Sequence, residues 1–293
     1  MTDHLRGTFM MVFGVLVLSP DTLLIYLVDA DSWTIVFWRG VLVALTIFAA
    51  MTVHYRRDVI RRFTDIGREG MISAALFGIT SITFVTSVTL TTAANTLVIV
   101  ASAPLFAAIF SRIFLREWVP MRTWAASAVG LFAMVIIFSG SLGGGALAGD
   151  ILALVTTICL AANFIVIRVH KEVSMVPAAA MGGIVCALVA LPFASPASIH
   201  PGDILPIIIM GTIVLPFPLV MITVAPKLIP APEVGLIMLL ETALGPLWVW
   251  LVVGQRASVE TLVGGGVILA TLVVHNILAF RQGSNANFQD PRS

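Results

Sequence analysis

Charged residues are scarce in this chain. Aspartate, glutamate, lysine and arginine make up 11% of its 293 residues, against about 25% in an average soluble domain. Hydrophobic residues make up 59%, and the mean hydropathy is +1.07. A soluble protein of this size has no means of covering its surface with so few charges, which excludes a soluble enzyme and a disordered chain. The net charge of +1 also excludes the global basic field that favours nucleic-acid binding.

Cysteine and histidine are also rare, which bears on metal binding and catalysis. The two cysteines, Cys159 and Cys186, both lie inside apolar runs, so they predict neither a disulfide framework nor a metal site. Four of the five histidines lie at loops or at the ends of apolar runs, without the spacing of metal ligands. No set of nucleophile, general base and metal ligand clusters along the chain. We therefore expect no metal, no cofactor and no enzymatic activity.

The chain does contain a series of apolar runs of about 20 residues, the length of a transmembrane helix. The first run is interpreted as a retained helix rather than a signal peptide, because Asp21 interrupts it and no small-residue cleavage site follows. The fold class is therefore an all-α membrane protein with ten transmembrane helices, placed in a bacterial-type inner membrane. The expected spans are 7–28, 33–53, 70–90, 94–112, 122–140, 150–169, 176–194, 204–224, 234–253 and 260–280.

The distribution of positive charge predicts the orientation of these spans. With the N-terminus placed in the cytoplasm, every lysine and arginine except Arg39 and Arg256 falls on the cytoplasmic side. Arg39 lies inside the second span, and Arg256 lies in an outer loop. Such a bias is typical of membrane proteins, and it predicts cytoplasmic N- and C-termini.

The two halves of the chain show a weak internal repeat. An offset of 142 residues pairs Asp21 with Asn163 and Gly40 with Gly182. Because each half contains an odd number of helices, the second must enter the membrane from the opposite side. This is the inverted repeat of secondary transporters, with a site expected near the midplane. The expected units are a first repeat at 1–142, a second at 149–281 and a cytoplasmic tail at 282–293.

Several short motifs resemble those of the drug/metabolite transporter superfamily, in particular its EamA-type exporters. The chain departs from the family pattern at Thr242, where proline is usual, and at Gln255, where glutamate is usual. The matching segments are Phe37-Trp38-Arg39-Gly40, Ala103-Pro104-Leu105-Phe106 with Leu115-Arg116-Glu117, and Leu239-Leu240-Glu241 with Gly254-Gln255. The resemblance implies a central cavity between helices 1, 3, 4, 6, 8 and 9, and export of small metabolites. Aromatic amino-acid exporters of the YddG type are the relatives it suggests.

Three ionisable side chains lie inside the expected spans, at a cost of about 2.5–3.5 kcal/mol each, and such residues usually mark a pathway. Asp21 and Arg39 lie at nearly the same depth, roughly 10 Å from the outer end of their helices, so we expect an ion pair. That pair is either an outer gate and substrate contact or a static link between helices 1 and 2. Glu241 and Asn163 lie in the inner half and are expected to form its inner counterpart.

Glu241 is also a candidate for proton coupling, because a carboxylate in a low-dielectric interior favours its neutral form. The alternative is a hydrogen-bonded glutamate that caps a helix break. On helix 3, four residues share one face and predict a cavity lining, or else bonds that join packed helices. These are Thr80, Thr83, Phe84 and Ser87.

Prolines and aromatic residues complete the predicted site. Pro216 and Pro218 in helix 8, and more weakly Pro104 in helix 4, are either hinges or fixed bends. Phe164 and Trp248 are the aromatic residues expected to face the cavity. Glycines 264–266 favour packing within the bundle over a dimer seam, and the sequence leaves monomer and dimer open.

The predicted function is export of a small metabolite, most readily an amino acid, by alternating access. The expected partners are this substrate and membrane lipid, with no nucleic acid. A zwitterion needs an acceptor for its ammonium group and donors for its carboxylate, and the residues above supply both. One alternative is export of cationic drugs on the same fold, and another is a membrane enzyme or channel.

Overall fold

The computed structural model describes residues 3–114, 116, 121–141, 146–170, 174–224 and 231–288. Within these ranges all regular secondary structure is helical. The elements are α1 (Asp3–Leu18), α2 (Asp21–Leu27), α3 (Ser32–Tyr55), η1 (Arg56–Asp58), α4 (Val59–Thr64), α5 (Gly67–Leu90), α6 (Ala93–Val100), α7 (Ala103–Phe114), α8 (Met121–Ser141), α9 (Leu147–Val169), α10 (Val176–Ala190), α11 (Ile204–Ile209), η2 (Met210–Val214), α12 (Pro216–Val224), α13 (Ala231–Val253) and α14 (Val259–Phe288).

These helices fall on the apolar segments expected from the sequence. Seven helical stretches are long and apolar enough to cross a membrane, and three shorter apolar helices accompany them at 176–190, 240–253 and 259–274. The long uncharged run from Met71 to Ser111 is divided at Thr91 and Thr92, as predicted, because α5 ends at Leu90 and α6 begins at Ala93. The chain is therefore an all-helical, multi-pass membrane protein. A total of ten crossings stays a prediction.

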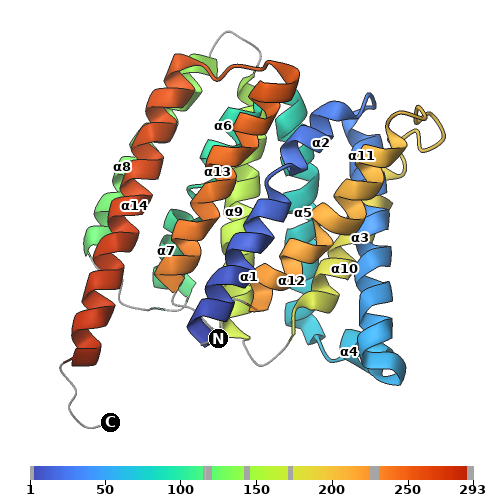
Figure 1. The fold of residues 1–293 in the computed structure, drawn as a ribbon, viewed down its shortest axis with the longest axis horizontal. Coiled ribbons are helices and arrows are strands. Elements are labelled where there is room, and N and C mark those ends of the chain that lie inside the picture. Colours follow the sequence, from blue (N-terminus) through green and yellow to red (C-terminus); the bar gives the residue numbers. More distant parts are fainter. Residues whose placement is uncertain are drawn as a thin grey trace.

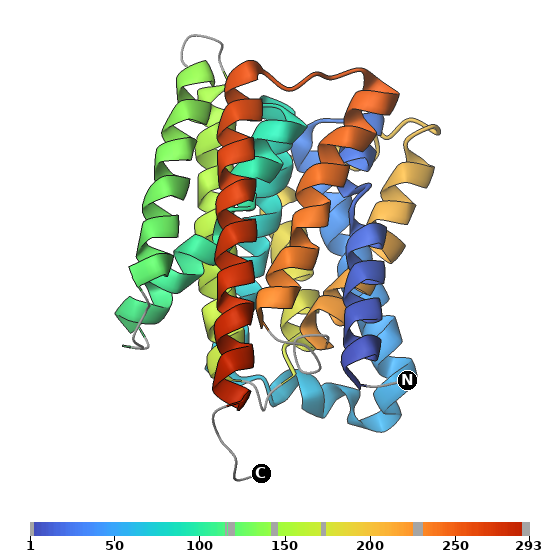
Figure 2. The same ribbon diagram turned by 60° about the vertical axis from the view of Figure 1, so that its left-hand side comes forward.

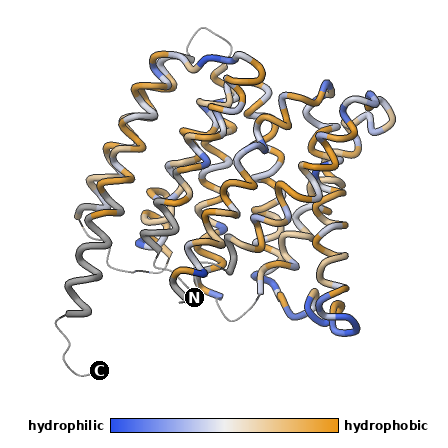
Figure 3. Tube along the Cα trace, in the orientation of Figure 1, coloured by the Kyte–Doolittle hydropathy of each residue, from blue (hydrophilic) through white to orange (hydrophobic). Residues whose placement is uncertain are grey.

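The helices run alongside one another in a single bundle (Figures 1 and 2). The start of α1 and the end of α14 lie at the same end, which we call the terminal end. The basic segment 56–62, formed by η1 and α4, also lies there and is strongly hydrophilic (Figure 3). The opposite end, called the far end, carries the connections between α2 and α3 and between α5 and α6.

Packing between the two halves of the chain comes in matched pairs. In the first set, α3 packs along α10 and α8 along α14. In the second set, α5 packs along α9, and α12 packs along α1. If the ten expected spans are numbered along the chain, α5 and α9 are spans 3 and 6, and α12 and α1 belong to spans 8 and 1. Exchanging the two halves turns the contact of spans 3 and 6 into the contact of spans 8 and 1, and it leaves the contacts α3–α10 and α8–α14 in place.

Three segments are broken near their middle. The first breaks at Ser19 and Pro20, between α1 and α2, and the fourth breaks at Ala101 and Ser102, between α6 and α7. The eighth changes from α to π geometry at η2, where the Leu215 amide donates to the Met210 carbonyl at 3.1 Å. Prolines lack the amide proton that a continuous helix needs, which explains why Pro20, Pro104 and Pro216 adjoin these breaks. The predicted bends are present at Pro104 and Pro216, while Pro218 lies inside α12.

Glycines allow two close approaches in the bundle. A Cβ at Gly40 would lie 2.5 Å from the Gly183 carbonyl oxygen, so α3 and α10 meet backbone to backbone. On α14, a Cβ at Gly264 would meet Ile137 of α8, and one at Gly265 would meet Val98 of α6. Gly264 and Gly265 therefore pack within the bundle, as the favoured interpretation of the sequence has it, whereas an added Cβ at Gly266 would meet nothing within 4 Å.

Candidate functional site

The candidate site is built around Arg39, which α3 positions at the centre of the far half of the bundle. Helix α3 starts cleanly because Asp31 caps it, accepting from the Trp33 amide at 2.9 Å and the Thr34 amide at 3.0 Å. Burial by itself would raise the pKa of Asp31, but the hydrogen bonds from Thr34 and Trp33 outweigh it and lower the pKa. The capped start fixes the register of α3 and therefore the depth of Arg39.

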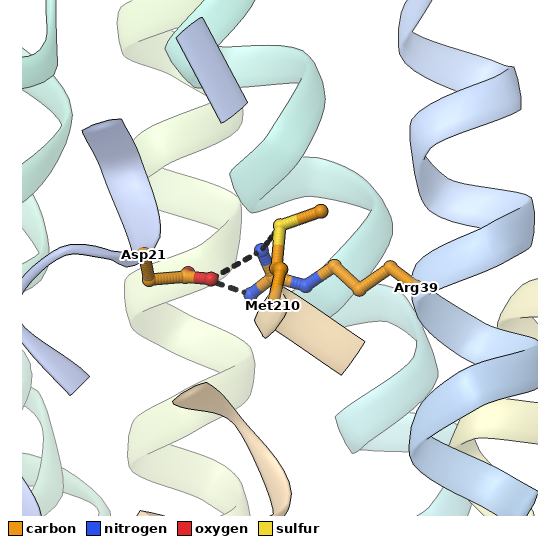
Figure 4. A network of polar contacts seen from close by, with 3 residues as sticks. All are labelled: Asp21, Arg39 and Met210. Atoms are coloured by element: carbon orange, nitrogen blue, oxygen red, sulfur yellow. Dashed lines mark hydrogen bonds and ion pairs between the residues drawn. The ribbon is translucent and has the colours of Figure 1, made fainter. Parts of the chain in front are cut away.

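Arg39 forms the ion pair with Asp21 that the sequence predicts. Its Nη2 lies 2.9 Å from Asp21 Oδ2, and its Nη1 donates to Asp21 Oδ1 at 3.0 Å (Figure 4). Both side chains are almost fully buried. Asp21 reaches this position because α2 restarts directly after Pro20. The two parallel bonds give the strong bidentate geometry of an arginine–carboxylate pair.

Two further side chains surround the guanidinium. Met210, the first residue of the π-helical segment η2, accepts from Arg39 Nη1 through its sulfur at 3.6 Å. The Arg39 guanidinium carbon lies 5.7 Å from the centre of the Phe84 ring on α5, within the range of a cation–π contact. Of the three guanidinium nitrogens, the buried Nε has no hydrogen-bond partner among the described residues. The ion pair is thus enclosed by α2, α3, α5 and the irregular part of the eighth segment.

Glu241 lies nearer to this pair than the sequence suggested. It is half-buried near the middle of α13 and interacts electrostatically with both Asp21 and Arg39. Within the described part of the chain, no hydrogen bond or ion pair engages its carboxylate. The site therefore combines two carboxylates with one guanidinium, and only one carboxylate is paired.

Trp248 connects the same helix to the break in the first segment. Its indole Nε1 donates to Ser19 Oγ at 3.0 Å, and Ser19 Oγ donates to the Leu16 carbonyl at 2.9 Å. The residue as a whole keeps 38% of its surface exposed. Glu241 and Trp248 are seven residues apart, so they lie on the same face of α13. The α13 face that carries Glu241 is therefore held against the residues that precede Asp21.

The expected pairing of Asn163 with Glu241 is wrong. Asn163 of α9 accepts instead from Ser73 Oγ of α5 at 2.6 Å, and both side chains are buried. They line a small pocket of about 30 Å³ whose other walls are apolar. The expectation failed because α13 begins at Ala231, which places Glu241 about 15 Å along the helix and nearer to its middle. Phe164 is half-buried beside Asn163 on α9.

The polar face of α5 serves mainly to join helices. Thr83 Oγ1 and Thr156 Oγ1 of α9 are 2.7 Å apart, and Ser87 Oγ and Thr96 Oγ1 of α6 are 2.8 Å apart. These contacts match the second interpretation of the stripe, as bonds between packed helices. Thr80 differs, because its buried Oγ1 has no hydrogen-bond partner. Of the four residues, Phe84 is the one in contact with the ion pair.

The comparisons with known proteins agree with this architecture. The model of the EamA-like transporter family matches residues 5–139 and again residues 147–277. The chain belongs to the EamA-like transporter family. One solved structure, titled "Crystal structure of protein", is similar with a TM-score of 0.66 and 17% identity, covering 94% of this chain and 98% of that chain. The search of curated proteins found no match.

This transporter has a second polar network, at the far end, that sequence analysis missed. Tyr26 donates to the Val88 carbonyl at 2.9 Å, and Gln255 Nε2 donates to the Tyr26 hydroxyl at 2.9 Å. Gln255 Oε1 accepts from the Ala93 amide at 3.0 Å. One chain of bonds therefore joins α2, α5, α6 and the α13–α14 connection. The available sequence clue was Gln255, one of the two positions where the chain departs from the pattern it otherwise resembles.

A buried acid lies beside that network. Asp150, in the first turn of α9, is 0% exposed and accepts from Thr91 Oγ1 at 2.7 Å and from Asn95 Nδ2 at 3.1 Å. Thr261 of α14 donates to Asn95 in turn. Thr92 caps α6, because its hydroxyl accepts from the Asn95 amide at 3.1 Å. The sequence clue was an acid at the edge of an apolar span.

Helix α13 of this transporter packs along both halves of the first segment, α1 and α2, but along only one half of the fourth within the described residues. Helix α13 packs against α2 and α6, which form the far halves of the first and fourth segments. Over the described residues it makes no comparable packing against α7, the terminal half of the fourth segment. Together with the Tyr26–Gln255 bond, these contacts tie the far halves of the first and fourth segments to α13 and its connection to α14.

Proposed function

We propose that the protein exports small organic molecules that carry an amino group, most readily neutral or aromatic amino acids, across a bacterial-type inner membrane. The observation that carries the proposal is the buried Asp21–Arg39 pair with an unpaired Glu241 beside it. Membership of the EamA-like transporter family supports transport of a small molecule as the general activity. The amino group is the part of such a substrate that a free carboxylate recognises.

The proposed mechanism is alternating access between two inverted halves, residues 1–142 and 149–281, with ten spans and both termini in the cytoplasm. Two observations support it. When the two halves are exchanged, each contact between helices corresponds to an equivalent contact in the other arrangement, as an inverted repeat requires. The bonds of Tyr26 and Gln255 close the far end, and the breaks beside Pro104 and Pro216 supply places for the segments to bend. The far end is then the outside, and the described state faces the cytoplasm.

A counterflow assay tests this function. Proteoliposomes loaded with unlabelled phenylalanine are expected to take up labelled phenylalanine faster than empty liposomes, and Glu241→Gln is expected to abolish the difference. Glu260→Gln is the matched control, because Glu260 lies at the start of α14, away from the ion pair. Equal uptake by the wild type and by empty liposomes for all amino acids would contradict amino-acid export.

Export of cationic drugs is the second candidate. Glu241 favours it, because an unpaired acid attracts any monocation and not only an amino acid. Counterflow of a quaternary ammonium dye separates the two candidates, since such a dye carries charge but no amino-acid backbone. Transport of the dye without transport of any amino acid would favour export of cationic drugs over export of amino acids.

A further inference from the structure

The substrate's carboxylate has no partner in the candidate site. Arg39 is the cation that a carboxylate would use, but both of its terminal nitrogens are committed to Asp21. Recruiting Arg39 would leave Asp21 buried without a counter-charge, which is strongly unfavourable. The nitrogen that remains, Arg39 Nε, presents a single donor rather than the two-pronged surface that recognises carboxylates.

The neutral donors on α5 are committed as well. Thr83 is bonded to Thr156 and Ser87 to Thr96, so both hydroxyls serve helix contacts. Asn163 is paired with Ser73 in a separate pocket. Thr80 is the one hydroxyl of the stripe with a free, buried oxygen. A single neutral hydroxyl is a poor substitute for the cation that a buried carboxylate needs.

The substrate's ammonium group has an available partner, the carboxylate of Glu241. Glu241 makes no hydrogen bond or ion pair within the described residues, and it shares a face of α13 with the partly exposed ring of Trp248. A helix face with a carboxylate and, two turns or about 10 Å further along, an indole suits an organic cation with an aromatic body. With Asp21 and Arg39 cancelling one another, an ionised Glu241 leaves the site with one negative charge. A monocation neutralises that charge, whereas a zwitterion adds a third carboxylate to a site that already holds two.

Resting on the proposed function, we infer that this site recognises the ammonium group of its substrate at Glu241 and makes no use of a carboxylate. Amines that lack the carboxylate are therefore substrates at least as good as the corresponding amino acids. The substrate class is a primary organic ammonium attached to an apolar or aromatic body. Acids without an amino group are excluded.

Calorimetric titration of the purified full-length protein tests this inference with three matched ligands: phenylalanine, phenethylamine and 3-phenylpropanoate. We expect phenethylamine to bind at least as tightly as phenylalanine and 3-phenylpropanoate not to bind. Glu241→Gln is expected to weaken binding of phenethylamine by at least about tenfold, since a charged hydrogen bond is lost. Glu241→Asp keeps a carboxylate and is expected to retain measurable binding, and Glu260→Gln is expected to bind as the wild type does.

The outcomes separate the inference from the proposed function. Phenylalanine binding at least tenfold tighter than phenethylamine, or any binding of 3-phenylpropanoate, would overturn the inference and leave amino-acid export standing. Binding of phenethylamine without phenylalanine would support the inference and overturn amino-acid export. If none of the three binds to a folded, monodisperse protein, both fail. Loss of binding in Glu260→Gln as well as Glu241→Gln would also count against the assignment to Glu241.

Discussion

Arg39 donates from both terminal nitrogens to the two carboxylate oxygens of Asp21, so α3 is tied to the far half of a broken first segment. The bond links a long continuous helix to the short α2, which begins only at Asp21. Any movement of α2 relative to α1 therefore changes the environment of the only ion pair described inside the spans. The contribution of the pair to stability can be measured separately from its role in transport, because one charge or both charges can be removed by substitution.

The first prediction concerns this pair. Asp21→Asn leaves Arg39 buried without a counter-charge, and we expect a loss of about 3–5 kcal/mol in the free energy of unfolding. Asp21→Asn combined with Arg39→Met removes both charges, so it is expected to cost much less. Thermal and denaturant unfolding in detergent measure both effects. A double variant that is as unstable as Asp21→Asn would contradict the argument.

Transport by the same double variant distinguishes the two roles that the sequence left open. A static link between α2 and α3 predicts counterflow close to the wild-type rate once stability is restored. A gate or substrate contact predicts loss of counterflow in a protein that is folded.

The second prediction concerns the bonds that close the far end. Tyr26→Phe removes the hydroxyl that bonds to Val88 and Gln255. At about 1 kcal/mol per hydrogen bond, the loss of both bonds shifts the population roughly thirtyfold toward the state open at the far end. The measurement is labelling by an impermeant thiol reagent of a cysteine at position 88, whose side chain is fully buried in the described state, in a background without Cys159 and Cys186.

Tyr55→Phe provides the control for that experiment. The chain has two tyrosines, and Tyr55 lies at the terminal end, where it contacts Arg62. The substitution is chemically identical but leaves the far-end network intact. Equal labelling rates in Tyr26→Phe and Tyr55→Phe would show that the Tyr26 hydroxyl does not close the far end.

The third prediction tests the close approach of α3 and α10. An alanine Cβ at Gly40 would lie 2.5 Å from the Gly183 carbonyl oxygen and 2.9 Å from the Ala187 amide nitrogen, and neither backbone atom has room to move. We expect Gly40→Ala to destabilise the protein by about 1–3 kcal/mol. Gly266→Ala is the control, because nothing lies within 4 Å of the added carbon, and alanine favours a helix over glycine by up to about 1 kcal/mol. Similar melting temperatures for the two variants would contradict this packing.

The ion pair could be predicted because both of its residues lie near helix ends that the sequence marks clearly. Asp21 and Arg39 flank a short connection, so their depths follow from counting residues at 1.5 Å each. Glu241 lies near the middle of a 23-residue helix whose start is poorly marked, and a shift of three residues separates it from Asn163 and places it near the Asp21–Arg39 pair. The bend at Pro20 was also missed, although Pro104 and Pro216 were recognised.

Contacts between distant parts of the chain could not be predicted in the same way. Tyr26 and Val88 are separated by 62 positions, and Gln255 lies a further 167 positions along. Which polar side chains meet across a bundle depends on the rotation and tilt of each helix, and apolar segments without a strong polar face do not fix that rotation. The polar face of α5 illustrates the same point. The sequence showed that its four residues share one face, but it did not show which residues of other helices they contact.

The fourth prediction fixes the orientation of the bundle. Ser198 is exposed at the far end, and Thr64 is exposed at the terminal end in α4. In intact cells, a cysteine at position 198 is expected to react with an impermeant thiol reagent, and one at position 64 only after the membrane is opened. The opposite pattern would place both termini outside and reverse the direction of transport proposed here.

The last prediction concerns protons. If Glu241 binds either a proton or the substrate's ammonium group, the two exclude one another at that carboxylate. Acid on the far side then displaces the ammonium group where the substrate must be released, so an inward proton gradient should speed outward transport. Efflux from proteoliposomes with an imposed pH gradient measures this, with Glu260→Gln as the control. Efflux that ignores the gradient in both directions would leave facilitated diffusion, because a carboxylate that never binds a proton during the cycle cannot couple the two flows.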